Sequence, residues 1–596
     1  MCGIFAYLGH KQNAAELTLA ALKTLEYRGY DSWGIAVKSK IENEKGKITV
    51  EKHIGKIGEA RTTLESSDLA IGHTRWATHG GVTDANAHPH LNTSKTIAVV
   101  HNGIVENYQE LKARLLESGV VFESQTDTEV VAHLIDQKAS TAKSFKDAVL
   151  QTFHDLVGSN AIVAMDVRSE EVVACRDGSP LVVGVSDDEL LLASDVTALL
   201  PYTRQIYFLR DGETVHLTRK GASIYDTKTG KEKKLELETI DWSVETAQKG
   251  AYRHFTLKEI VEQSVTIPRA LKLNDDSIAE LATRIPKSSR VILTGCGTAF
   301  YCALIAKYFF AHAGIAVDAI PANELLAFVP LLDDKSMVIA ISQSGETADT
   351  LIAVKAAQAR GATLVAVVNA RSSTLERLAN TVLSVGSGPE IGVVSTKAFT
   401  AQTATMYNLA CACHPERSEG SHDHVSKPVA DSSQLASWLS PTLLKSIEDI
   451  AAGLLTSQDI YVVGKYDQYP VALEVALKIK EASYIHAEGF ACGELKHGVI
   501  SLIQKGTPCI VVANEDEVKR EVLSSATELK TRGALIIGIS PEGAPEYDIH
   551  IPTLRGELLT PLTNAIVGQL LGYYLSVGRG LDPDKPRNLA KSVTVK

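Results

Sequence analysis

The sequence predicts an α+β domain over residues 1–240, followed by two α/β modules with parallel sheets at residues 251–425 and 426–585. Short apolar runs typical of strands dominate the first part, whereas in the second part each such run is followed by a long helical pattern. The order of strands and helices in the second part occurs twice, which indicates an internal duplication. A linker at 241–250 and a tail at 586–596 complete the predicted organisation.

In the first part, the spacing of apolar residues predicts two helices, at residues 14–25 and 107–118. The runs expected to form strands are residues 97–100, 161–165, 181–185 and 189–193. Residues 4–7 form a further apolar run beside the amino terminus, and we expect a buried strand there.

The first α/β module is expected to alternate strands and helices over residues 291–294, 299–313, 337–341, 348–360 and 363–368. The second module repeats this order at residues 460–464, 471–482, 508–513, 517–532 and 534–539. Strands that are each followed by a helix are typical of parallel sheets.

The composition is typical of a soluble globular protein, with 45% hydrophobic and 22% charged residues. No apolar run approaches the ~20 residues that cross a bilayer, and no signal sequence opens the chain, so we expect a cytoplasmic protein without a membrane partner. The net charge of -11 argues against a nucleic-acid partner. The eight cysteines are too sparse for a disulfide framework.

The amino terminus carries the first candidate catalytic group. Cys2 and Gly3 are small enough for Met1 to be removed, which would leave a thiol and a free α-amine on one residue. A free thiol has a pKa of about 8.5 and an α-amine titrates near ~7.7–8.0, so the amine is a suitable base for the sulfur. The alternative is an accidental cysteine at a frayed terminus. The apolar run that follows favours the nucleophile, because a buried strand would hold the terminus in place.

Three polar clusters lie in predicted turns of the first part, at residues 72–80, 101–103 and 126–129. The Asn102 amide beside the Gly103 N–H offers two donors to an oxyanion. Arg75 and Asp127 match the carboxylate and the ammonium group of an amino-acid substrate. Singly, these residues have structural explanations: a hairpin turn, a surface charge and a helix N-cap. Only their conjunction favours a function.

The motifs at residues 2–4, 25–32, 73–80, 86–90 and 101–103 resemble the glutaminase domain of N-terminal-nucleophile amidotransferases. The resemblance implies a fold of two antiparallel sheets sandwiched between helices. It implies the following site residues: Cys2 as nucleophile with its own amine as base, Asn102 and Gly103 as oxyanion hole, Arg75, Thr78 and His79 around the glutamine carboxylate, Asp127 at the ammonium group, and Trp76 with Arg28 along an ammonia channel.

The loop at residues 342–347, Ser-Gln-Ser-Gly-Glu-Thr, is the strongest binding signal of the second part. Three hydroxyls and an amide cluster where a strand gives way to a helix, so they can converge on one anion with the free N–H groups of the helix start. Ordinary N-capping needs only one Ser or Thr. We therefore expect a phosphate monoester, and a sugar phosphate rather than a nucleotide, because nucleotide-binding motifs are lacking. The equivalent turn of the second module, residues 513–516, carries two carboxylates that would repel phosphate.

A second chemical candidate is the predicted helix that carries Glu474, Lys478 and Glu481. Their spacing places all three on one face. A solvated stripe of ion pairs is the alternative, and the spacing does not separate the two interpretations. Downstream, a titratable cluster that ends at His497 is bracketed by glycines, and a histidine there can act near neutral pH.

Residues 342–350, 395–400, 474–498 and 588–595 resemble the sugar-isomerase module. Joined to the first part, they resemble the family of glutamine-dependent enzymes that aminate fructose 6-phosphate, over nearly the full chain. The resemblance implies that glutamine and fructose 6-phosphate give glutamate and glucosamine 6-phosphate, with no cofactor and no metal.

The resemblance also implies roles for the second part. His497 would open the sugar ring, Lys591 would form an imine, and Glu481 would move a proton, with Lys478 as its helical neighbour. The tail would close over the sugar. The implied contacts of the sugar phosphate are Ser342, Gln343, Ser344, Thr347, Val393, Ser395, Thr298 and Ala590.

Two features depart from the family pattern. Ala299 stands where the family often has Ser, which leaves one sugar contact in doubt. Residues 413–424 are polar and aperiodic where a helix is expected, and an exposed loop is favoured over a metal site there.

Two alternative functions remain open at this point. One is an amidotransferase with a different acceptor, which would need a nucleotide or diphosphate loop. The other is a sugar-phosphate-sensing regulator, which would need a basic DNA-binding segment. The duplicated modules favour a homodimer.

Overall fold

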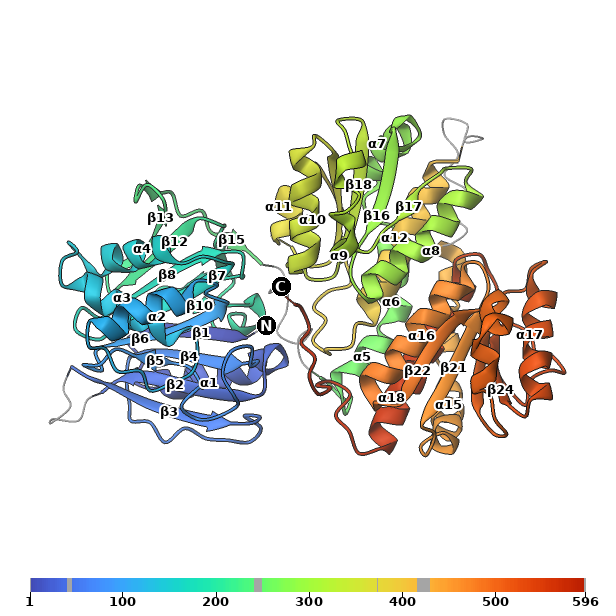
Figure 1. The fold of residues 1–596 in the computed structure, drawn as a ribbon, viewed down its shortest axis with the longest axis horizontal. Helices are drawn as coiled ribbons and strands as arrows, with labels where there is room; N and C mark the ends of the chain where they lie inside the picture. Colours follow the sequence, from blue (N-terminus) through green and yellow to red (C-terminus); the bar gives the residue numbers. More distant parts are fainter. Residues whose placement is uncertain (1, 40–45, 241–248, 372, 415–428, 594–596) are drawn as a thin grey trace. The chain divides into compact units, whose positions relative to one another are not determined.

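The computed structural model describes residues 2–39, 46–240, 249–371, 373–414 and 429–593. The chain forms two compact units (Figure 1). The first contains residues 1–247 and 590–596, and the second contains residues 248–589. The division near residue 247 falls inside the predicted linker, most of which lies outside the described residues, as do residues 415–424 of the polar segment and the predicted border between the two modules.

The first unit contains two antiparallel sheets. The eight-stranded sheet has the order β15-β11-β9-β10-β1-β4-β2-β3. Its strands are β1 (Gly3–Gly9), β2 (Ser32–Lys38), β3 (Ile48–Ile54), β4 (Leu69–Arg75), β9 (Val182–Val185), β10 (Glu189–Ala193), β11 (Gln205–Phe208) and β15 (Glu238–Thr239). The seven-stranded sheet has the order β14-β13-β12-β8-β7-β6-β5. Its strands are β5 (His90–Leu91), β6 (Ile97–Gly103), β7 (Asn160–Asp166), β8 (Glu171–Asp177), β12 (Glu213–Thr218), β13 (Gly221–Asp226) and β14 (Glu232–Lys233).

The two sheets pack face to face, and helices cover their outer faces (Figure 1). Alternation along β1 shows the layering: Ile4, Ala6 and Leu8 enter the core between the sheets, whereas Phe5 and Tyr7 pack on the helix side. This arrangement confirms the predicted sandwich of antiparallel sheets. It also confirms the buried strand at the amino terminus, because β1 lies between β4 and β10.

The described part of this unit has four α-helices where two were predicted. They are α1 (Ala14–Leu25), α2 (Tyr108–Glu117), α3 (Glu129–Ala139) and α4 (Phe145–Asp155). The first two match the prediction. The prediction missed α3 because its first seven residues are all buried, which removes the polar side of the helical pattern.

The second unit contains two five-stranded parallel sheets. The strands of the first are β16 (Arg290–Thr294), β17 (Asp318–Ala319), β18 (Ser336–Ser342), β19 (Thr363–Val368) and β20 (Thr381–Ser384). The strands of the second are β21 (Asp459–Gly464), β22 (His486–Ala491), β23 (Pro508–Val512), β24 (Leu535–Ser540) and β25 (Ile549–Pro552). Their orders, β17-β16-β18-β19-β20 and β22-β21-β23-β24-β25, are the same, which confirms the duplication.

Helices surround both sheets of the second unit (Figure 1). The α-helices are α5 (Phe255–Val261), α6 (Gln263–Ala270), α7 (Asp275–Arg284), α8 (Thr298–His312), α9 (Ala322–Leu325), α10 (Ala348–Ala359), α11 (Thr374–Leu378), α12 (Lys397–Ala412), α14 (Leu435–Trp438), α15 (Pro441–Gly453), α16 (Gln468–Ser483), α17 (Lys519–Thr531) and α18 (Leu559–Gly578). Short 3-10 turns across the chain are η1 (Glu26–Arg28), η3 (Val196–Ala198), η5 (Ile285–Lys287), η6 (Val329–Leu331), η7 (Cys492–His497) and η8 (Val499–Leu502).

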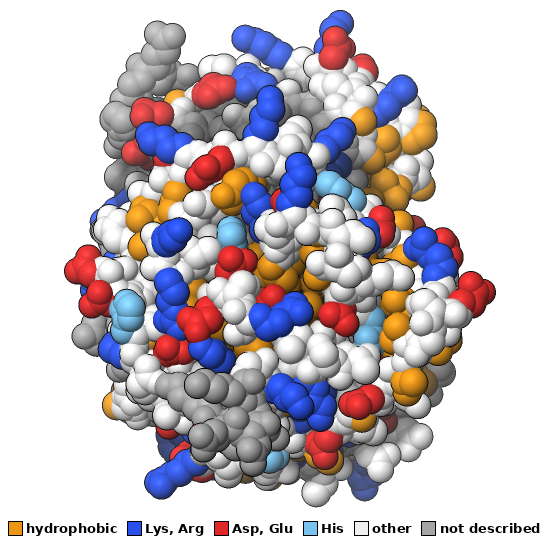
Figure 2. All heavy atoms as spheres, turned by 90° about the vertical axis from the view of Figure 1, so that its left-hand side faces the viewer, with side chains coloured by type: hydrophobic (Ala, Val, Ile, Leu, Met, Phe, Trp, Pro, Cys, Tyr) orange, Lys and Arg blue, Asp and Glu red, His pale blue; other side chains and the backbone are white. Residues whose placement is uncertain are grey.

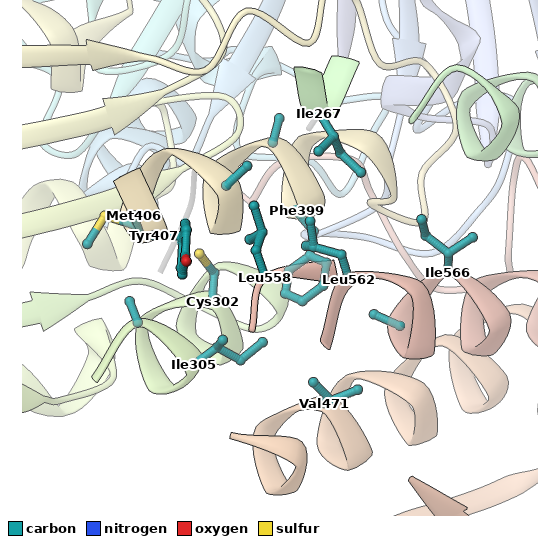
Figure 3. Close-up of a cluster of buried hydrophobic side chains, with 14 of the residues drawn as sticks. Ile267, Cys302, Ile305, Phe399, Met406, Tyr407, Val471, Leu558, Leu562 and Ile566 are labelled. Atoms are coloured by element: carbon teal, nitrogen blue, oxygen red, sulfur yellow. The ribbon is translucent and has the colours of Figure 1, made fainter. Parts of the chain in front are cut away.

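The two modules share one hydrophobic core (Figure 3). Cys302 and Ile305 from α8 and Phe399 from α12 meet Val471 from α16 and Leu562 from α18. Because burying apolar side chains is the main favourable term in folding, the shared core joins the modules into one body. The first turns of helices α8 and α16 are thereby fixed relative to one another.

Figure 2 shows a face of the molecule on which positive and negative side chains are interspersed. None of the helices in the described ranges has the length and the apolar content that a membrane crossing requires.

Candidate active sites

Hydrogen bonds of its side chain and its carbonyl oxygen hold Cys2 in place at the start of β1. Its Sγ accepts a hydrogen bond from the Trp76 backbone N–H at 3.2 Å. Its carbonyl oxygen accepts from Asn102 Nδ2 at 2.9 Å and from Arg28 Nε at 3.3 Å. Cys2 is half-buried. These contacts argue against the alternative of a frayed terminus.

The surroundings of Cys2 act on its thiol in opposite directions. Burial raises the pKa of the Cys2 thiol, while the hydrogen bond from Trp76 and the charges of Arg75 and Arg28 lower it in part. The net effect is a raised pKa, so the thiol needs a base to react at neutral pH. Met1, whose removal would free that base, lies outside the described residues.

Asn102 and Gly103 form the end of strand β6, so the prediction of a turn there is wrong. They pair with Ala161 and Asn160 of β7. Gly103 has φ +130°, and a Cβ at this position would collide with the carbonyl oxygen of Ser159. Only glycine fits this conformation, which explains why the strand can end with a backbone N–H beside the site.

A small pocket brings most of the predicted glutamine-site residues together. It is lined by Cys2, Arg75, Trp76, Thr78, His79, His88, His101, Gly103, Thr126, Asp127 and Thr128. The nucleophile, the guanidinium and the carboxylate that the sequence proposed for one amino-acid substrate thus face one cavity.

Arg75 and Asp127 are buried, so neither is a surface residue. The Arg75 guanidinium donates to the carbonyls of His79, Gly80 and Gly81, which fixes the loop that follows β4. The Asp127 carboxylate accepts from the Val105 N–H at 2.8 Å. Since α3 begins at Glu129 after Thr128, the alternative of Asp127 as the N-cap is wrong.

Glu129 supports this site, although the sequence prediction gave it no role. Its carboxylate accepts from the N–H groups of Glu123 and Ser124, both at 2.7 Å, and from Ser124 Oγ at 2.6 Å. Burial acts to raise its pKa, but His133, whose Nε2 lies 3.6 Å from the carboxylate, and the hydrogen bonds from Ser124 outweigh burial and lower the pKa to about 2. The anion therefore holds the segment that leads to Asp127.

Arg28 reaches Cys2 from the 3-10 turn after α1. Its guanidinium pairs with Asp195 at 3.2 Å, and Tyr27 donates to the same carboxylate at 2.7 Å. The Arg28 side chain is only 5% exposed, so this pair is screened little by water. Arg28 and Trp76 thus both contact Cys2, Arg28 at the carbonyl oxygen and Trp76 at the sulfur.

The first parallel sheet places the loop at residues 342–347 where ligands bind in such folds. Its strand order reverses between β16 and β18, and the carboxyl ends of strands at such a point form a crevice. Ser342 Oγ accepts from the Gly345 N–H at 3.0 Å, and Ser344 Oγ accepts from the Glu346 N–H at 3.2 Å. Thr347, the residue before α10, makes no side-chain cap bond. Gln343 and Thr347 are half-buried at this crevice.

Glu474, Lys478 and Glu481 form a buried ion triad on α16. Lys478 Nζ lies 3.4 Å from Glu474 and 3.0 Å from Glu481. The side chains of Glu474 and Lys478 are 0% and 1% exposed, so the alternative of a solvated stripe is wrong. Thr298 Oγ1, at the start of α8 in the other module, donates to Glu474 at 3.0 Å.

Burial sets the charge of this triad. It raises the pKa of the Glu474 carboxyl to about 7, against the attraction of Lys478. Burial acts to lower the pKa of Lys478, but the two carboxylates outweigh burial and raise the pKa. The triad therefore holds a charged lysine beside Glu481, whose side chain is 20% exposed.

The remaining predicted sugar-site residues are less closely grouped. Val393 is buried and its N–H donates to the Asp584 carbonyl, and Ser395 Oγ donates to Glu390. His497 is exposed at the end of η7, and within the described ranges no hydrogen bond or ion pair joins it to the triad. Ala590 and Lys591 belong to the first unit.

Comparisons with known proteins agree with both halves of this description. Residues 73–201 match the glutamine amidotransferase domain family, and residues 284–412 and 453–577 match the SIS domain family. The chain is 40% identical to the isomerizing glutamine–fructose-6-phosphate aminotransferase of Clostridium acetobutylicum and 41% identical to that of Pyrococcus horikoshii, with 100% of each chain covered in both comparisons. The chain belongs to the family of isomerizing glutamine–fructose-6-phosphate aminotransferases. It is therefore an enzyme.

The solved structures include a similar chain for the second unit. The C-terminal domain of glucosamine-fructose-6-phosphate aminotransferase from Francisella tularensis is 29% identical, with a TM-score of 0.52, and the match covers 57% of this chain and 100% of that one. The paired parallel sheets of this aminotransferase thus have the fold of that domain.

Proposed function

We propose that the enzyme hydrolyses glutamine at Cys2 and transfers the ammonia to fructose 6-phosphate, with isomerisation of the aminated sugar to glucosamine 6-phosphate. The observation that carries this proposal is the pocket shared by Cys2, Arg75 and Asp127, on a chain whose relatives are named for this reaction over their full length. Glutamate is the second product.

In the glutaminase half, the α-amine of Cys2 takes the thiol proton and the sulfur attacks the amide carbon of glutamine. The oxyanion accepts hydrogen bonds from Asn102 Nδ2 and the Gly103 N–H. The carbon–nitrogen bond breaks, the amine returns the proton to the leaving ammonia, and water then hydrolyses the thioester. Arg75, Thr78 and His79 hold the substrate carboxylate and Asp127 its ammonium group.

In the sugar half, the hydroxyls of Ser342, Ser344 and Thr347, the Gln343 amide and the start of α10 bind the phosphate. Thr298, Val393, Ser395 and Ala590 line the sugar. His497 assists ring opening, and Lys591 forms an imine at the ketose carbonyl with loss of water. Ammonia then displaces the lysine amine, which leaves the sugar imine, and Glu481 moves a proton between adjacent carbons while Lys478 fixes its carboxylate.

The ammonia passes between the halves past Trp76 and Arg28, because ammonia released into water would be protonated and lost. Lys591 is four residues beyond Arg587, whose guanidinium lies 4.2 Å over the Tyr484 ring at the end of α16. Arg587, just before Lys591 in the sequence, thus lies at the end of the helix that carries Glu481.

We propose further that the enzyme is a cytoplasmic homodimer whose sugar site uses both copies. The exposed position of His497 supports this, since a second copy can present it. Mixing a His497→Ala variant with a Lys591→Ala variant after dissociation and reassociation tests it. A shared site predicts partial recovery of synthesis in the mixture, and no recovery would contradict it.

Product analysis with two variants tests the division of labour. Cys2→Ala should lose synthesis from glutamine and keep synthesis from concentrated ammonium at raised pH. Lys591→Ala should keep glutamate release and form no amino sugar, with Lys591→Arg as a charge-matched control that also lacks synthesis. If the acceptor were not fructose 6-phosphate, or if the protein were a sensor without turnover, the parent would form no amino sugar from this substrate. Both variants would then equal the parent in the assay.

A further inference from the structure

We infer that His73 is a positioning residue for glutamine hydrolysis, because it fixes the direction of the Asn102 side-chain amide. The inference rests on the proposed role of Asn102 as an oxyanion donor. His73 lies on β4, and its side chain is fully buried beside the pocket.

The hydrogen bonds around Asn102 leave only one orientation for its amide. Asn102 Nδ2 donates to the Cys2 carbonyl oxygen at 2.9 Å, and Asn102 Oδ1 lies 3.1 Å from His73 Nε2. His73 Nε2 also lies 3.0 Å from the His101 carbonyl oxygen. Both neighbours of this nitrogen are acceptors, so Nε2 carries the proton and donates. A flipped amide would set donor against donor at His73 and acceptor against acceptor at Cys2.

The surroundings keep the His73 ring neutral and in place. Its Nδ1 is buried and has no hydrogen-bond partner among the described residues, so a proton there would be unpaired. The ring stacks on His88 with centroids 4.2 Å apart, and His88 meets His90 at 4.8 Å. Burial above all, with smaller contributions from Arg75 and His101, lowers the pKa of His73 to about 3, against the hydrogen bonds with Asn102 and the His101 carbonyl, which act to raise it.

The backbone holds this ring in register with the nucleophile. His73 pairs with Ile4 of β1, two residues after Cys2, and with Gly34 of β2 on the other side. A Cβ on Gly34 would collide with the His88 carbonyl oxygen, so the His88 segment lies directly on the sheet. The donor at His73 Nε2 is therefore built into the central strands and not into a loop.

A misdirected Asn102 would present its oxygen to the oxyanion in place of Nδ2. Loss of one oxyanion donor lowers kcat by about 10²–10³-fold in enzymes of known mechanism. For His73→Leu we expect kcat for glutamine hydrolysis to fall by about 10–100-fold, since the amide still points correctly part of the time. The KM for glutamine should change less than about threefold, because the oxyanion exists only in the transition state.

Three variants separate positioning from a general effect on folding. His73→Gln keeps an N–H donor near the position of Nε2. Its kcat should therefore be at least tenfold higher than that of His73→Leu. His216→Gln is the control: His216 is half-buried on β12, pairs with Glu171 and makes no hydrogen bond with Asn102. Its kcat should stay near that of the parent. Synthesis from ammonium should be unchanged in all three, since it bypasses this site.

A double-mutant cycle decides the inference. In an Asn102→Ala background, His73→Leu should lower kcat no further, because its target is gone. An equal loss in both backgrounds, or equal activity of His73→Leu and His73→Gln, would overturn the inference. If Asn102→Ala alone left glutamine hydrolysis intact, the proposed oxyanion role of Asn102 would fail instead. Inhibition by an aldehyde analogue of glutamine, which forms a tetrahedral adduct with Cys2, should weaken in His73→Leu in parallel with kcat.

Discussion

Thr298 and Glu474 are joined by a hydrogen bond of 3.0 Å across the two modules of the second unit. Thr298 opens α8 in the first module, and Glu474 lies on α16 in the second. The bond ties the helix of the ion triad to the start of α8 in the other module. In the proposed function, the duplicated modules would therefore build one sugar site together rather than one site each.

The buried carboxyl of Glu474 should make stability depend on pH. Its pKa is about 7 in the folded protein against 4.5 in the unfolded chain, so the folded state keeps a proton that the unfolded state has released between these values. This contribution to stability is complete below pH 4.5 and is lost as pH rises through 7. The loss is at most about 3 kcal/mol.

Thermal midpoints from pH 5 to pH 8 measure this effect. The midpoint of the parent should fall relative to that of Glu474→Gln over this range. Glu448→Gln is the control, because Glu448 is exposed and pairs with Lys445 on α15. If the thermal midpoints of the parent and of Glu474→Gln differed by the same amount at every pH, the raised pKa of Glu474 would be contradicted.

Gly345→Ala should weaken sugar-phosphate binding. Gly345 has φ +64°, and a Cβ there would lie 2.5 Å from Ser373 Cβ, so the phosphate loop must shift. The left-handed conformation alone costs about 1–2 kcal/mol without glycine. We expect the KM for fructose 6-phosphate to rise at least tenfold, while glutamate release without sugar stays the same.

Gly314→Ala is the matched control for this variant. Gly314 has φ +73° in the same module, and its Cβ would meet nothing within 4 Å. It carries the same backbone cost without the collision, so its KM for the sugar should stay near that of the parent. Equal KM values for both alanine variants would show that the loop does not hold the phosphate.

Glu129→Gln should impair glutamine binding through Asp127. The neutral amide retains one acceptor oxygen, so one of the two N–H bonds to residues 123 and 124 is lost, and hydrogen bonds to a charged group contribute about 1.5–3 kcal/mol each. We expect the KM for glutamine to rise by about tenfold or more. Glu171→Gln is the control, because Glu171 also pairs with a histidine, His216. This variant should not change the KM for glutamine. Steady-state glutaminase assays compare the two, and a KM shift of the same size in both would point to a global effect.

Helix α1 could be predicted from the sequence because its burial is one-sided, and strands β10 and β19 could be predicted because they are short apolar runs. Helix α1 and strands β10 and β19 have the predicted bounds. Helix α3 was missed since burial of seven consecutive residues hides its period. The prediction placed the polar clusters in turns because it took polar residues as the sign of a turn. At the site, however, the end of strand β6 itself carries polar side chains.

Site residues that lie in sequence motifs could be predicted. Roles that depend on a partner distant in the sequence could not. Cys2, Arg75 and Asp127 lie in motifs, and the structure brings them to one pocket. Spacing placed Glu474 and Lys478 on one face, but the hydrogen-bond partner of Glu474 in the other module is Thr298, 176 residues away. The role of His73 depends on Asn102, 29 residues away, and no local pattern indicates it.

Isotope transfer tests the central claim, that nitrogen freed at Cys2 reaches the sugar inside the enzyme. The enzyme is given glutamine labelled with ¹⁵N in its amide, fructose 6-phosphate and an excess of unlabelled ammonium. We predict glucosamine 6-phosphate that carries the label almost undiluted. Amino sugar with the isotope ratio of the bulk ammonium, or labelled ammonium without amino sugar, would contradict the account.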